Sequence, residues 1–382
     1  MGIDGLPKYI TRYAGSAVSS YKLSKFKGWK VSVDTSLLLY QIVKAMRAGN
    51  SETVNDRGEL TSHLQGIFNK VLGFLQNGII PIFVFDGKSP DIKRVTSELR
   101  KCASKKAEDK LVDTDLDTDS LEYCRLYAQA YHATHEHFEE AKILLDLMGV
   151  PYVLAPEEAD PVCVWLTVRK DENGKRYANG VATEDSDMLP LGTPYLLKNM
   201  LSAVTKNSEV TVIRSRRTLM GLGITREQFV ETCVMLGTDY SNNIKGVGPV
   251  ATHNLMEKHG SLDEIIKVYR KKLKGEESFE NNAKCMGLAK EYFMTALQQL
   301  DDNGFGVTED QTELSVCQKD NLIDFLVNKH NFEPSGIVYK VSMLEQYHKS
   351  LDVTRPNTKE THVNTGKIDY RIVASPQEYE FD

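Results

Sequence analysis

The sequence predicts an α/β fold in which a mainly parallel, twisted sheet is flanked by helices on both faces. Three apolar stretches, at residues 30–34, 79–86 and 180–187, read as buried strands and alternate with stretches of helical periodicity. Each of these stretches ends in acidic residues. Ligands of parallel sheets bind beyond the carboxyl ends of the strands, so we expect these acids to meet at one rim.

The elements follow from local patterns along the chain. Gly49 suits the C-cap of the first long helix, and Thr61 or Ser62 suits the N-cap of the next. In chain order we expect a strand at 30–34, helices at 35–49 and 60–78, a strand at 79–86, a charged and partly helical segment at 87–110, an acidic break at 112–119, a long helix over about 120–149 that ends at Gly149, a strand, loop and helix start at 151–160, a strand at 180–187, and a flexible polar tail after about 345.

Composition narrows the class of protein. The 382 residues are 41% hydrophobic and 26% charged, which is typical of a soluble globular protein. The net charge of −6 gives no overall positive field, so binding to nucleic acid would need a local basic face. The six cysteines form no C-x-x-C pair, which argues against a structural zinc site or a disulfide framework and favours reduced thiols. We expect neither a membrane span nor a signal peptide.

Carboxylates gathered without histidine or cysteine indicate a site for hard divalent cations, Mg²⁺ or Mn²⁺. Two such ions about 3.5–4 Å apart can activate water and stabilise the leaving oxygen of a phosphodiester. A single Asp after a strand is more often a helix N-cap or a turn residue, but the same position recurs here on separate strands. The candidates are Asp34, Asp86, Glu158, Asp160, Asp185, Asp187 and Asp239.

A second signal is the turn Gly246-Val247-Gly248-Pro249, with Pro249 suited to the first position of a helix. The pattern predicts a helix–hairpin–helix whose exposed backbone N–H groups hold a DNA phosphate, with or without a bridging monovalent cation. A plain helix–turn–helix that serves only for packing is the alternative.

A third signal is the basic segment 87–110. Lys93 and Arg100 are seven residues apart and would share one face of a helix, from which they could reach a scissile phosphate. A solvated charged face is the alternative.

Together these stretches closely resemble the flap endonucleases, the structure-specific five-prime nucleases of DNA replication and repair. The resemblance rests on "MGIDGLPKYI", "VSVDTSLLLYQ", "TSHLQGIF", "NGIIPIFVFDGKSPDIK", "LLDLMGVPYVLAPEEAD", "VATEDSDMLPLG" and "LGTDYSNNIKGVGPVA". It implies a PIN-like nuclease core with a helical arch. The implied regions are an N-terminal nuclease region at 1–107, an arch or cap at 108–148, an internal nuclease region at 149–270 with the helix–hairpin–helix at 242–258, a C-terminal helical wrap at 271–345, and a tail at 346–382.

The resemblance also implies roles for single residues. Two Mg²⁺ ions, with Mn²⁺ as a substitute, would lie near Asp34, Asp86, Glu158 and Asp160 and near Asp185, Asp187 and Asp239, with K⁺ at the helix–hairpin–helix. Lys93, Arg100 and Asp185 would be catalytic. DNA would contact Gly2, Tyr40, Arg47, Lys70, Lys93, Arg100, Glu158, Gly246 and Gly248.

Some positions depart from the flap endonuclease pattern and keep alternatives open. Flap endonucleases usually have Glu at position 160, whereas the exonuclease branch of the family has Asp there, as this chain does. A mainly 5′–3′ double-strand exonuclease is therefore an alternative. A catalytically silent protein that binds DNA junctions and a D-x-D phosphatase are two further alternatives. Around Gln311 no complete sliding-clamp motif is present, because Cys317 and Gln318 replace its two aromatic residues.

For partners and location, the resemblance implies branched or flapped DNA as the partner and no membrane. We expect a monomer without tight clamp binding, and a nuclear location (the host nucleus if a virus encodes the chain).

Overall fold

The structure is a computed structural model that describes residues 2–3, 5–49, 53–55, 58, 60–87, 105–106, 109–111, 120–131, 133–203, 205–273 and 276–354. Its strands are β1 (Val18–Lys22), β2 (Lys30–Asp34), β3 (Ile80–Phe85), β4 (Tyr152–Leu154), β5 (Gly180–Ala182), β6 (Tyr195–Lys198) and β7 (Glu209–Arg214). Its α-helices are α1 (Leu6–Tyr13), α2 (Thr35–Ala48), α3 (Ser62–Gln76), α5 (Leu121–Gln129), α6 (His135–Met148), α7 (Ala159–Val168), α8 (Met188–Leu191), α9 (Ser215–Leu222), α10 (Arg226–Leu236), α11 (Pro249–His259), α12 (Leu262–Lys272), α13 (Glu277–Asp302), α14 (Lys319–Asp324) and α15 (Pro334–Ser350).

The described strands form one seven-stranded sheet in the order β1-β7-β6-β5-β2-β3-β4. Strands β4, β3, β2, β5 and β6 pair in parallel, whereas β7 pairs antiparallel with both β6 and β1. This confirms the predicted mainly parallel sheet. The chain moves outward from β2 to β3 and β4, and later returns to place β5 on the other side of β2. The boundary between β2 and β5 is therefore the topological switch point, where such sheets bind ligands.

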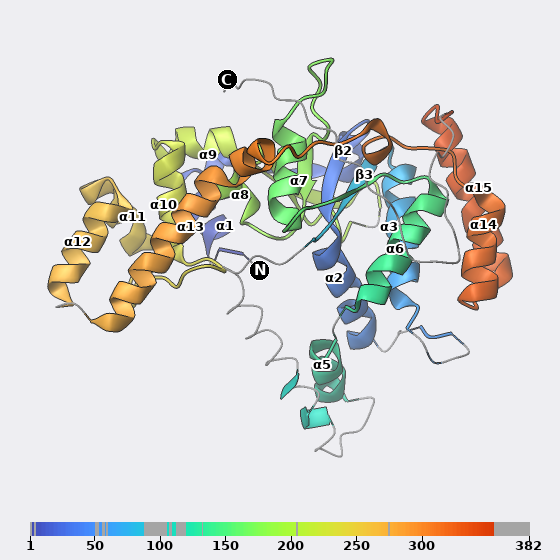
Figure 1. Cartoon of the computed structure of the whole chain (residues 1–382), viewed down its shortest axis with the longest axis horizontal. Helices are drawn as coiled ribbons and strands as arrows, with labels where there is room; N and C mark the ends of the chain where they lie inside the picture. The colour runs from blue at the N-terminus through green and yellow to red at the C-terminus, as the bar shows by residue number, and fades with distance from the viewer. Residues whose placement is uncertain are drawn as a thin grey trace.

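Alternate residues of β3 enter two separate cores, one on each face of the sheet. Ile82 and Val84 pack in the core formed with α1, α7, α10 and α13, and Phe83 and Phe85 pack in the core formed with α2, α3 and α6. Figure 1 shows these two groups of helices on either side of the strands, with α5 extending away below α2. A strand covered on both faces reads as a continuous apolar run, which explains why "IIPIFVFD" signals a buried strand.

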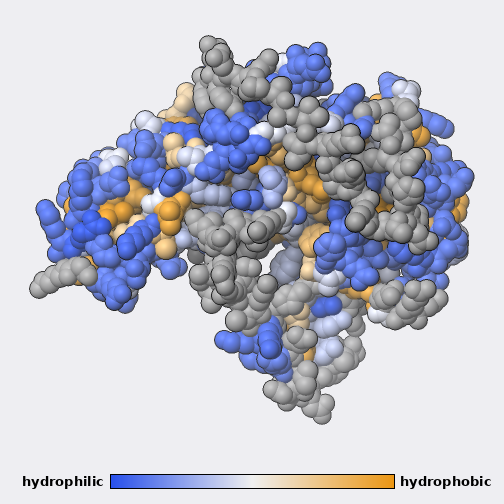
Figure 2. Space-filling view, viewed as in Figure 1, coloured by the Kyte–Doolittle hydropathy of each residue, from blue (hydrophilic) through white to orange (hydrophobic). Residues whose placement is uncertain are grey.

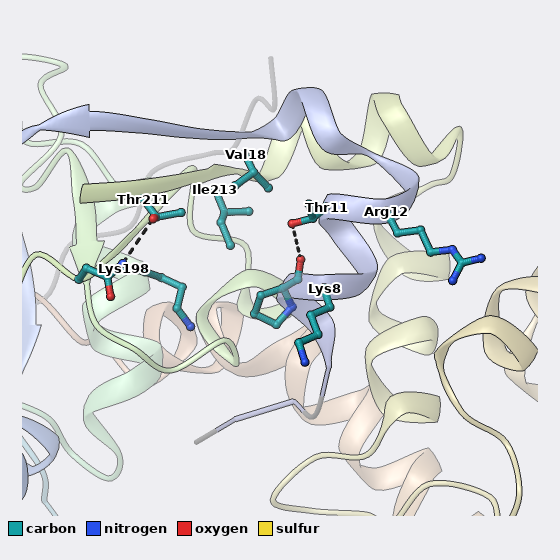
Figure 3. A pocket seen from close by; sticks show the side chains of 9 residues that line it. Lys8, Thr11, Arg12, Val18, Lys198, Thr211 and Ile213 are labelled. Atoms are coloured by element: carbon teal, nitrogen blue, oxygen red, sulfur yellow. Dashed lines mark hydrogen bonds between the residues drawn. The ribbon is translucent and has the colours of Figure 1, made fainter. Parts of the chain in front are cut away.

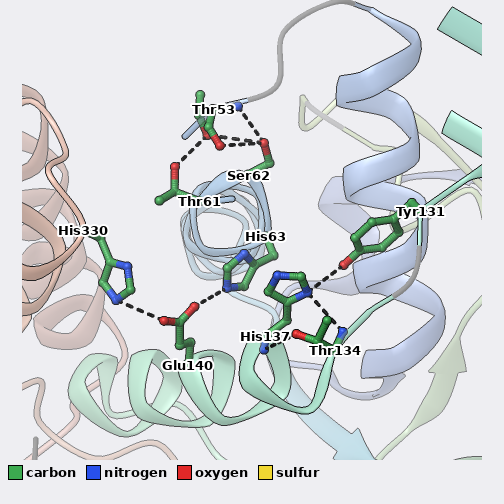
Figure 4. A network of polar contacts seen from close by, with 9 residues as sticks. All are labelled: Thr53, Thr61, Ser62, His63, Tyr131, Thr134, His137, Glu140 and His330. Carbon is green, nitrogen blue, oxygen red and sulfur yellow. Dashed lines mark hydrogen bonds and ion pairs between the residues drawn. The ribbon is translucent and has the colours of Figure 1, made fainter. Parts of the chain in front are cut away.

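The long helix expected over 120–149 is wrong. The structure has two helices, α5 and α6, separated by residues 130–134. Thr134 caps α6 because its hydroxyl accepts from the His137 N–H, while His137 Nδ1 accepts from the Thr134 N–H (Figure 4). A capping box normally has Glu or Gln at the third helical position, where this chain has His137. The sequence pattern therefore did not indicate that a helix begins here. The expected end at Gly149 is confirmed, with φ at 69°.

The C-terminal part of the described chain is more ordered than its polar sequence indicates. Helix α15 continues to Ser350, past the point near 345 where the tail was expected to begin. The rest of that tail, from 355 on, lies outside the described residues, as does the acidic break at 112–119. The visible face is mainly hydrophilic over α12 at one end and over α14 and α15 at the other (Figure 2). No helix among the described residues is long and apolar enough to cross a membrane.

Candidate active site

Three acids follow the carboxyl ends of neighbouring strands, as the sequence predicts. Asp34 ends β2, Asp86 follows β3, and Asp185 lies three residues beyond the end of β5. Two of them also serve local structure, because Asp34 caps α2 by accepting from the Leu37 N–H at 3.1 Å and Asp86 accepts from the Ala159 N–H at 2.8 Å. The second bond holds the start of α7 against the end of β3. It brings Glu158 and Asp160, at that helix start, to the same rim.

The electrostatics of Asp34 show that these acids act on one another. The pKa of the Asp34 carboxyl is raised well above its usual value by burial first and then by the negative charges of Asp86, Asp160 and Asp185. The buried Cys163 thiol, below the rim, also has a raised pKa, because of burial and then the charges of Asp34, Asp160 and Asp86. The pKa values of Asp34 and Cys163 are therefore both raised by charges from nearly the same set of carboxylates. We call Asp34, Asp86, Glu158, Asp160, Asp185 and Asp187 the acid rim.

Two tyrosines hold Glu158 from the side of the sheet that faces α7. The phenol oxygens of Tyr240 and Tyr292 donate hydrogen bonds to Glu158 Oε2 at 2.9 and 2.7 Å. The two rings pack together with their centroids 4.7 Å apart. Burial, followed by the nearby Glu158 charge, raises the pKa of Tyr240, so its phenol stays a donor. These bonds fix the orientation of the Glu158 carboxylate.

The loop after β5 carries Asp185 and Asp187. Asp185 Oδ1 accepts from the Asp187 N–H at 2.9 Å, which orders the loop. Gly2 packs directly against this loop, because a Cβ atom on Gly2 would lie only 2.2 Å from Asp185 Oδ1. Only glycine fits there, and φ at 77° is a second reason. The predicted neighbour of the site, Gly2, is thus packed on the acid rim. Asp239 lies in the turn after α10, beside Tyr240.

The donor set of the acid rim suits a hard divalent cation, because it consists of carboxylates with neither histidine nor an accessible thiol among them. Bringing a cation here would also offset the repulsion that raises the pKa of Asp34. Within the described ranges, however, no three His, Cys, Asp or Glu side chains form a group that could hold a metal ion as they stand. Asp34, Asp86 and Glu158 each accept protein hydrogen bonds through a carboxylate oxygen, which holds the orientation of their side chains.

The hairpin at residues 244–249 exposes its two glycines, while Ile244 and Val247 anchor it in the core. Gly246 has φ at 81°, and a Cβ atom on either Gly246 or Gly248 would have no neighbour within 4 Å. Pro249 occupies the first turn of α11, and Gly248 is its N-cap without a side-chain cap. Backbone N–H groups at such a helix start favour an anion. The turn and the helix start at Pro249 agree with the sequence.

Three further residues expected to contact DNA, Arg47, Lys70 and Tyr40, contact other parts of the protein. Arg47 donates to the Tyr127 carbonyl at 3.1 Å, and its guanidinium lies 4.2 Å from the centre of the Tyr127 ring. Lys70 donates to the Leu201 carbonyl, and burial lowers the pKa of its ammonium. The Tyr40 ring is half-buried, 6.4 Å from the ring of Tyr131. Lys93 and Arg100 lie outside the described residues.

Comparison with known proteins gives a consistent result. Residues 1–107 match the model of the XPG N-terminal domain, and residues 149–239 match that of the XPG I-region. Flap endonuclease 1 of Saccharomyces cerevisiae is 36% identical over 355 residues, which cover 92% of this chain and 88% of the yeast protein. The chain belongs to the flap endonuclease family. This family membership confirms the resemblance seen in the sequence.

Solved structures of the family have the same fold. The flap endonuclease-1 of Methanococcus jannaschii superposes with a TM-score of 0.62 at 25% identity, covering 87% of this chain and 96% of that one. The catalytic core of Rad2 in complex with a DNA substrate gives a TM-score of 0.58 at 24% identity, covering 90% of this chain and all of that one. The arrangement of sheet and helices is thus that of the flap endonuclease fold.

Sequence reasoning missed the two tyrosines at Glu158. Tyr240 directly follows Asp239 in "LGTDYS", so its position beside an acid was a usable signal. Tyr292 lies on α13, 134 residues from Glu158, and no local pattern marks it. Only the packing of α13 against α7 brings it to the acid rim.

Proposed function

We propose that this member of the flap endonuclease family is a structure-specific 5′ flap endonuclease with 5′–3′ exonuclease activity. It hydrolyses DNA phosphodiesters at junctions of single and double strands during replication and repair. The observation that supports the proposal most directly is the position of Asp34, Asp86 and Asp185 after the carboxyl ends of three neighbouring strands, with Asp160 at the start of α7. The relationship to flap endonuclease 1 of yeast supports the substrate class.

The acid rim would hold two Mg²⁺ ions, with Mn²⁺ as a substitute. Asp34, Asp86, Glu158 and Asp160 would serve one ion, and Asp185, Asp187 and Asp239 the other. When bound, the ions lower the pKa of a coordinated water and offset charge on the phosphate. In this scheme Tyr240 and Tyr292 keep the Glu158 carboxylate in one orientation. Gly2 lets its own backbone approach Asp185 closely.

The remaining predicted contacts would hold DNA against this rim. The backbone at Gly246 and Gly248 would hold a phosphate of the duplex, with K⁺ as a bridge. Stacking of a base on Tyr40 would contribute about 1–3 kcal/mol and so offset part of the cost of unpairing the nucleotide beside the cut. We propose Lys93 and Arg100 as the basic pair that contacts the scissile phosphate, and Arg47 and Lys70 as further contacts to the backbone.

One observation favours a second candidate, a mainly 5′–3′ double-strand exonuclease. Asp160 takes part in the acid rim and is one carbon shorter than the Glu usual in flap endonucleases. A shorter side chain at this position leaves more room beside Asp34 and Asp86. With that room, the strand that is cut could follow a different path from the one in a flap endonuclease, as an exonuclease would require.

The test is cleavage of end-labelled DNA by the full chain. Five-prime flaps, gapped forks, Holliday junctions and blunt duplex are compared with Mg²⁺ and with chelator. We expect a cut at the base of the flap that requires the metal, with slower release of nucleotides from the duplex end. Faster degradation of blunt duplex than of flaps would favour the exonuclease. Tight binding of flaps without any cut would favour a silent junction-binding protein, and turnover of nitrophenyl phosphate a phosphatase.

We also propose that the chain acts as a monomer in the nucleus, without tight docking to a sliding clamp. The support is its family membership and the incomplete motif around Gln311. A single monomer mass in sedimentation, unchanged by added clamp, is the expected result.

A further inference from the structure

Helix α1 presents two different faces. Its inner face carries Leu6, Tyr9 and Ile10, all buried in the core below the sheet. Its outer face carries Lys8, Thr11 and Arg12, which are exposed. The spacing of three and four residues places these three side chains together on the helix surface.

The outer face of α1 forms one wall of a pocket with a volume of about 430 Å³. The opposite wall comes from the sheet edge, with Val18 on β1, Thr211 and Ile213 on β7, and the β6 end. Figure 3 shows Lys8 and Lys198 extending toward the same side of the pocket from opposite walls, with Arg12 farther along α1. The lining thus combines an apolar floor with a basic edge.

The pocket has an excess of positive charge. The nine residues that line it include three cations, Lys8, Arg12 and Lys198, and no acid, and Lys198 is ion-paired at 3.7 Å with Glu184 outside the lining. Neither Lys8 nor Arg12 forms an ion pair within the part of the chain that the structure describes. This local excess stands out in a chain with a net charge of −6, where a polyanion can be attracted only by local basic surfaces.

The pocket is joined to the acid rim through two short connections. Lys198 donates to the Glu184 carbonyl at 3.0 Å, and the Asn199 N–H donates to the Glu184 carboxylate at 2.6 Å. Glu184 directly precedes Asp185. From the other wall, the segment before α1 reaches the same loop, because Ser186 donates to the Ile3 carbonyl. The loop that carries Asp185 is therefore held against both walls of this pocket.

We propose that this pocket is a binding site for the phosphodiester backbone of the DNA strand beside the cut. Lys8 and Arg12 contact successive phosphates, and Pro7, Val18 and Ile213 pack against the deoxyribose between them. A phosphate backbone matches both features of the lining, since its charge meets the basic edge and its sugars meet the apolar floor. The inference rests on the proposed function and adds a site that lies away from the hairpin at residues 244–249.

The salt dependence of DNA binding tests this site directly. Each phosphate contact that is lost lowers the slope of log Kobs against log[salt] by about 0.9. We expect the double variant Lys8→Ser/Arg12→Ser to bind five-prime-flap DNA in chelating buffer with a slope smaller by about 1–2. Both side chains are exposed, and Arg12 contacts only the Tyr13 ring among the contacts described for it, so we expect the substitutions to leave the fold intact, which a melting curve checks.

The matched control is Lys170→Ser/Lys175→Ser, which removes the same charge from exposed positions in the loop after α7. A slope that changes in the pocket variant and not in the control supports the proposal. Equal changes in both variants, or no change in either, would overturn it. Flap cleavage is measured for the wild type and both variants. If the pocket variant has an unchanged slope while the wild type cleaves normally, the pocket proposal alone is refuted. If the wild type does not cleave, the proposed function is refuted.

A second measurement locates the contact along the strand. Single neutral methylphosphonate linkages are placed in turn at each phosphate flanking the cut. We expect one or two positions at which the neutral linkage weakens binding to the wild type and has no effect on Lys8→Ser/Arg12→Ser, because the two changes remove the same contact. Equal losses in both proteins at every position would overturn the proposal.

Discussion

The phenol of Tyr292 lies 2.7 Å from the Glu158 carboxylate and so connects α13, far along the chain, to the acid rim. Tyr240 reaches the same oxygen at 2.9 Å, so Glu158 is held by two donors. A carboxylate bound in this way is fixed in orientation before any ligand arrives. The C-terminal helices therefore contribute to the geometry of the site as well as to the core.

Loss of the Tyr292 hydroxyl tests this arrangement. A hydrogen bond to a charged group contributes about 1.5–3 kcal/mol, and the second phenol remains, so we expect Tyr292→Phe to lower kcat/KM for flap cleavage about tenfold. The half-saturating Mg²⁺ concentration should rise as well. Tyr269→Phe, which removes a phenol from α12 away from the rim, is the control and should leave both values unchanged. Equal values for Tyr292→Phe and wild type would exclude this role.

The acid rim and the sheet could be predicted from the sequence because their signals are local. Strands buried on both faces give continuous apolar runs, and an acid at the end of each run marks the ligand edge. The antiparallel strands β7 and β1 were not expected, since Val18–Lys22 is largely exposed and lacks such a run. Contacts such as those between Tyr292 and Glu158 depend on packing between distant helices, which local patterns do not encode.

Arg47 has a structural role in addition to the predicted contact with DNA. Its guanidinium lies over Tyr127 and Tyr131 at the base of α5, 4.2 and 5.2 Å from the ring centres. Lysine cannot reproduce this stacking, which contributes about 0.5–2 kcal/mol. We expect Arg47→Lys to speed amide hydrogen exchange in α5 severalfold without DNA present. Lys44→Arg on the same helix should not change it, and unaltered exchange in Arg47→Lys would contradict the role.

His253 links α1 to α11, the helix that follows the hairpin. Its Nδ1 lies 3.0 Å from the Tyr9 hydroxyl, and its ring stacks on Tyr13 with the centroids 3.8 Å apart. Loss of one hydrogen bond and one aromatic pair should cost about 1–3 kcal/mol, so we expect His253→Ala to lower the free energy of unfolding by this amount. Denaturant unfolding measures it. The neighbouring exposed Asn254 gives the control Asn254→Ala, and matching stabilities of the two variants would count against the link.

His348 makes stability depend on pH. It is buried on α15, neither ring nitrogen has a hydrogen-bond partner in the described part of the chain, and burial lowers its pKa to about 4. Because the folded pKa lies below the unfolded one, the stabilisation is complete above about pH 6.5 and is lost as pH falls toward 4. When the pH falls from about 7.5 to about 5, we expect the free energy of unfolding to decrease by about 2 kcal/mol more in the wild type than in His348→Leu. Thermal unfolding of both proteins across this range checks it, and parallel pH profiles would refute it.

We expect carboxylates from separate strands to act together as a metal-dependent centre for cutting DNA. The most direct measurement is the single-turnover rate of flap cleavage in saturating Mg²⁺ for Asp34→Asn and Asp185→Asn, with the exposed Asp263→Asn on α12 as control. We predict that both rim variants bind the flap and cut it at least about 100-fold more slowly than wild type, since several kcal/mol of transition-state stabilisation is lost. The control should cut at the wild-type rate. Cleavage by Asp34→Asn and Asp185→Asn at the wild-type rate would contradict the account.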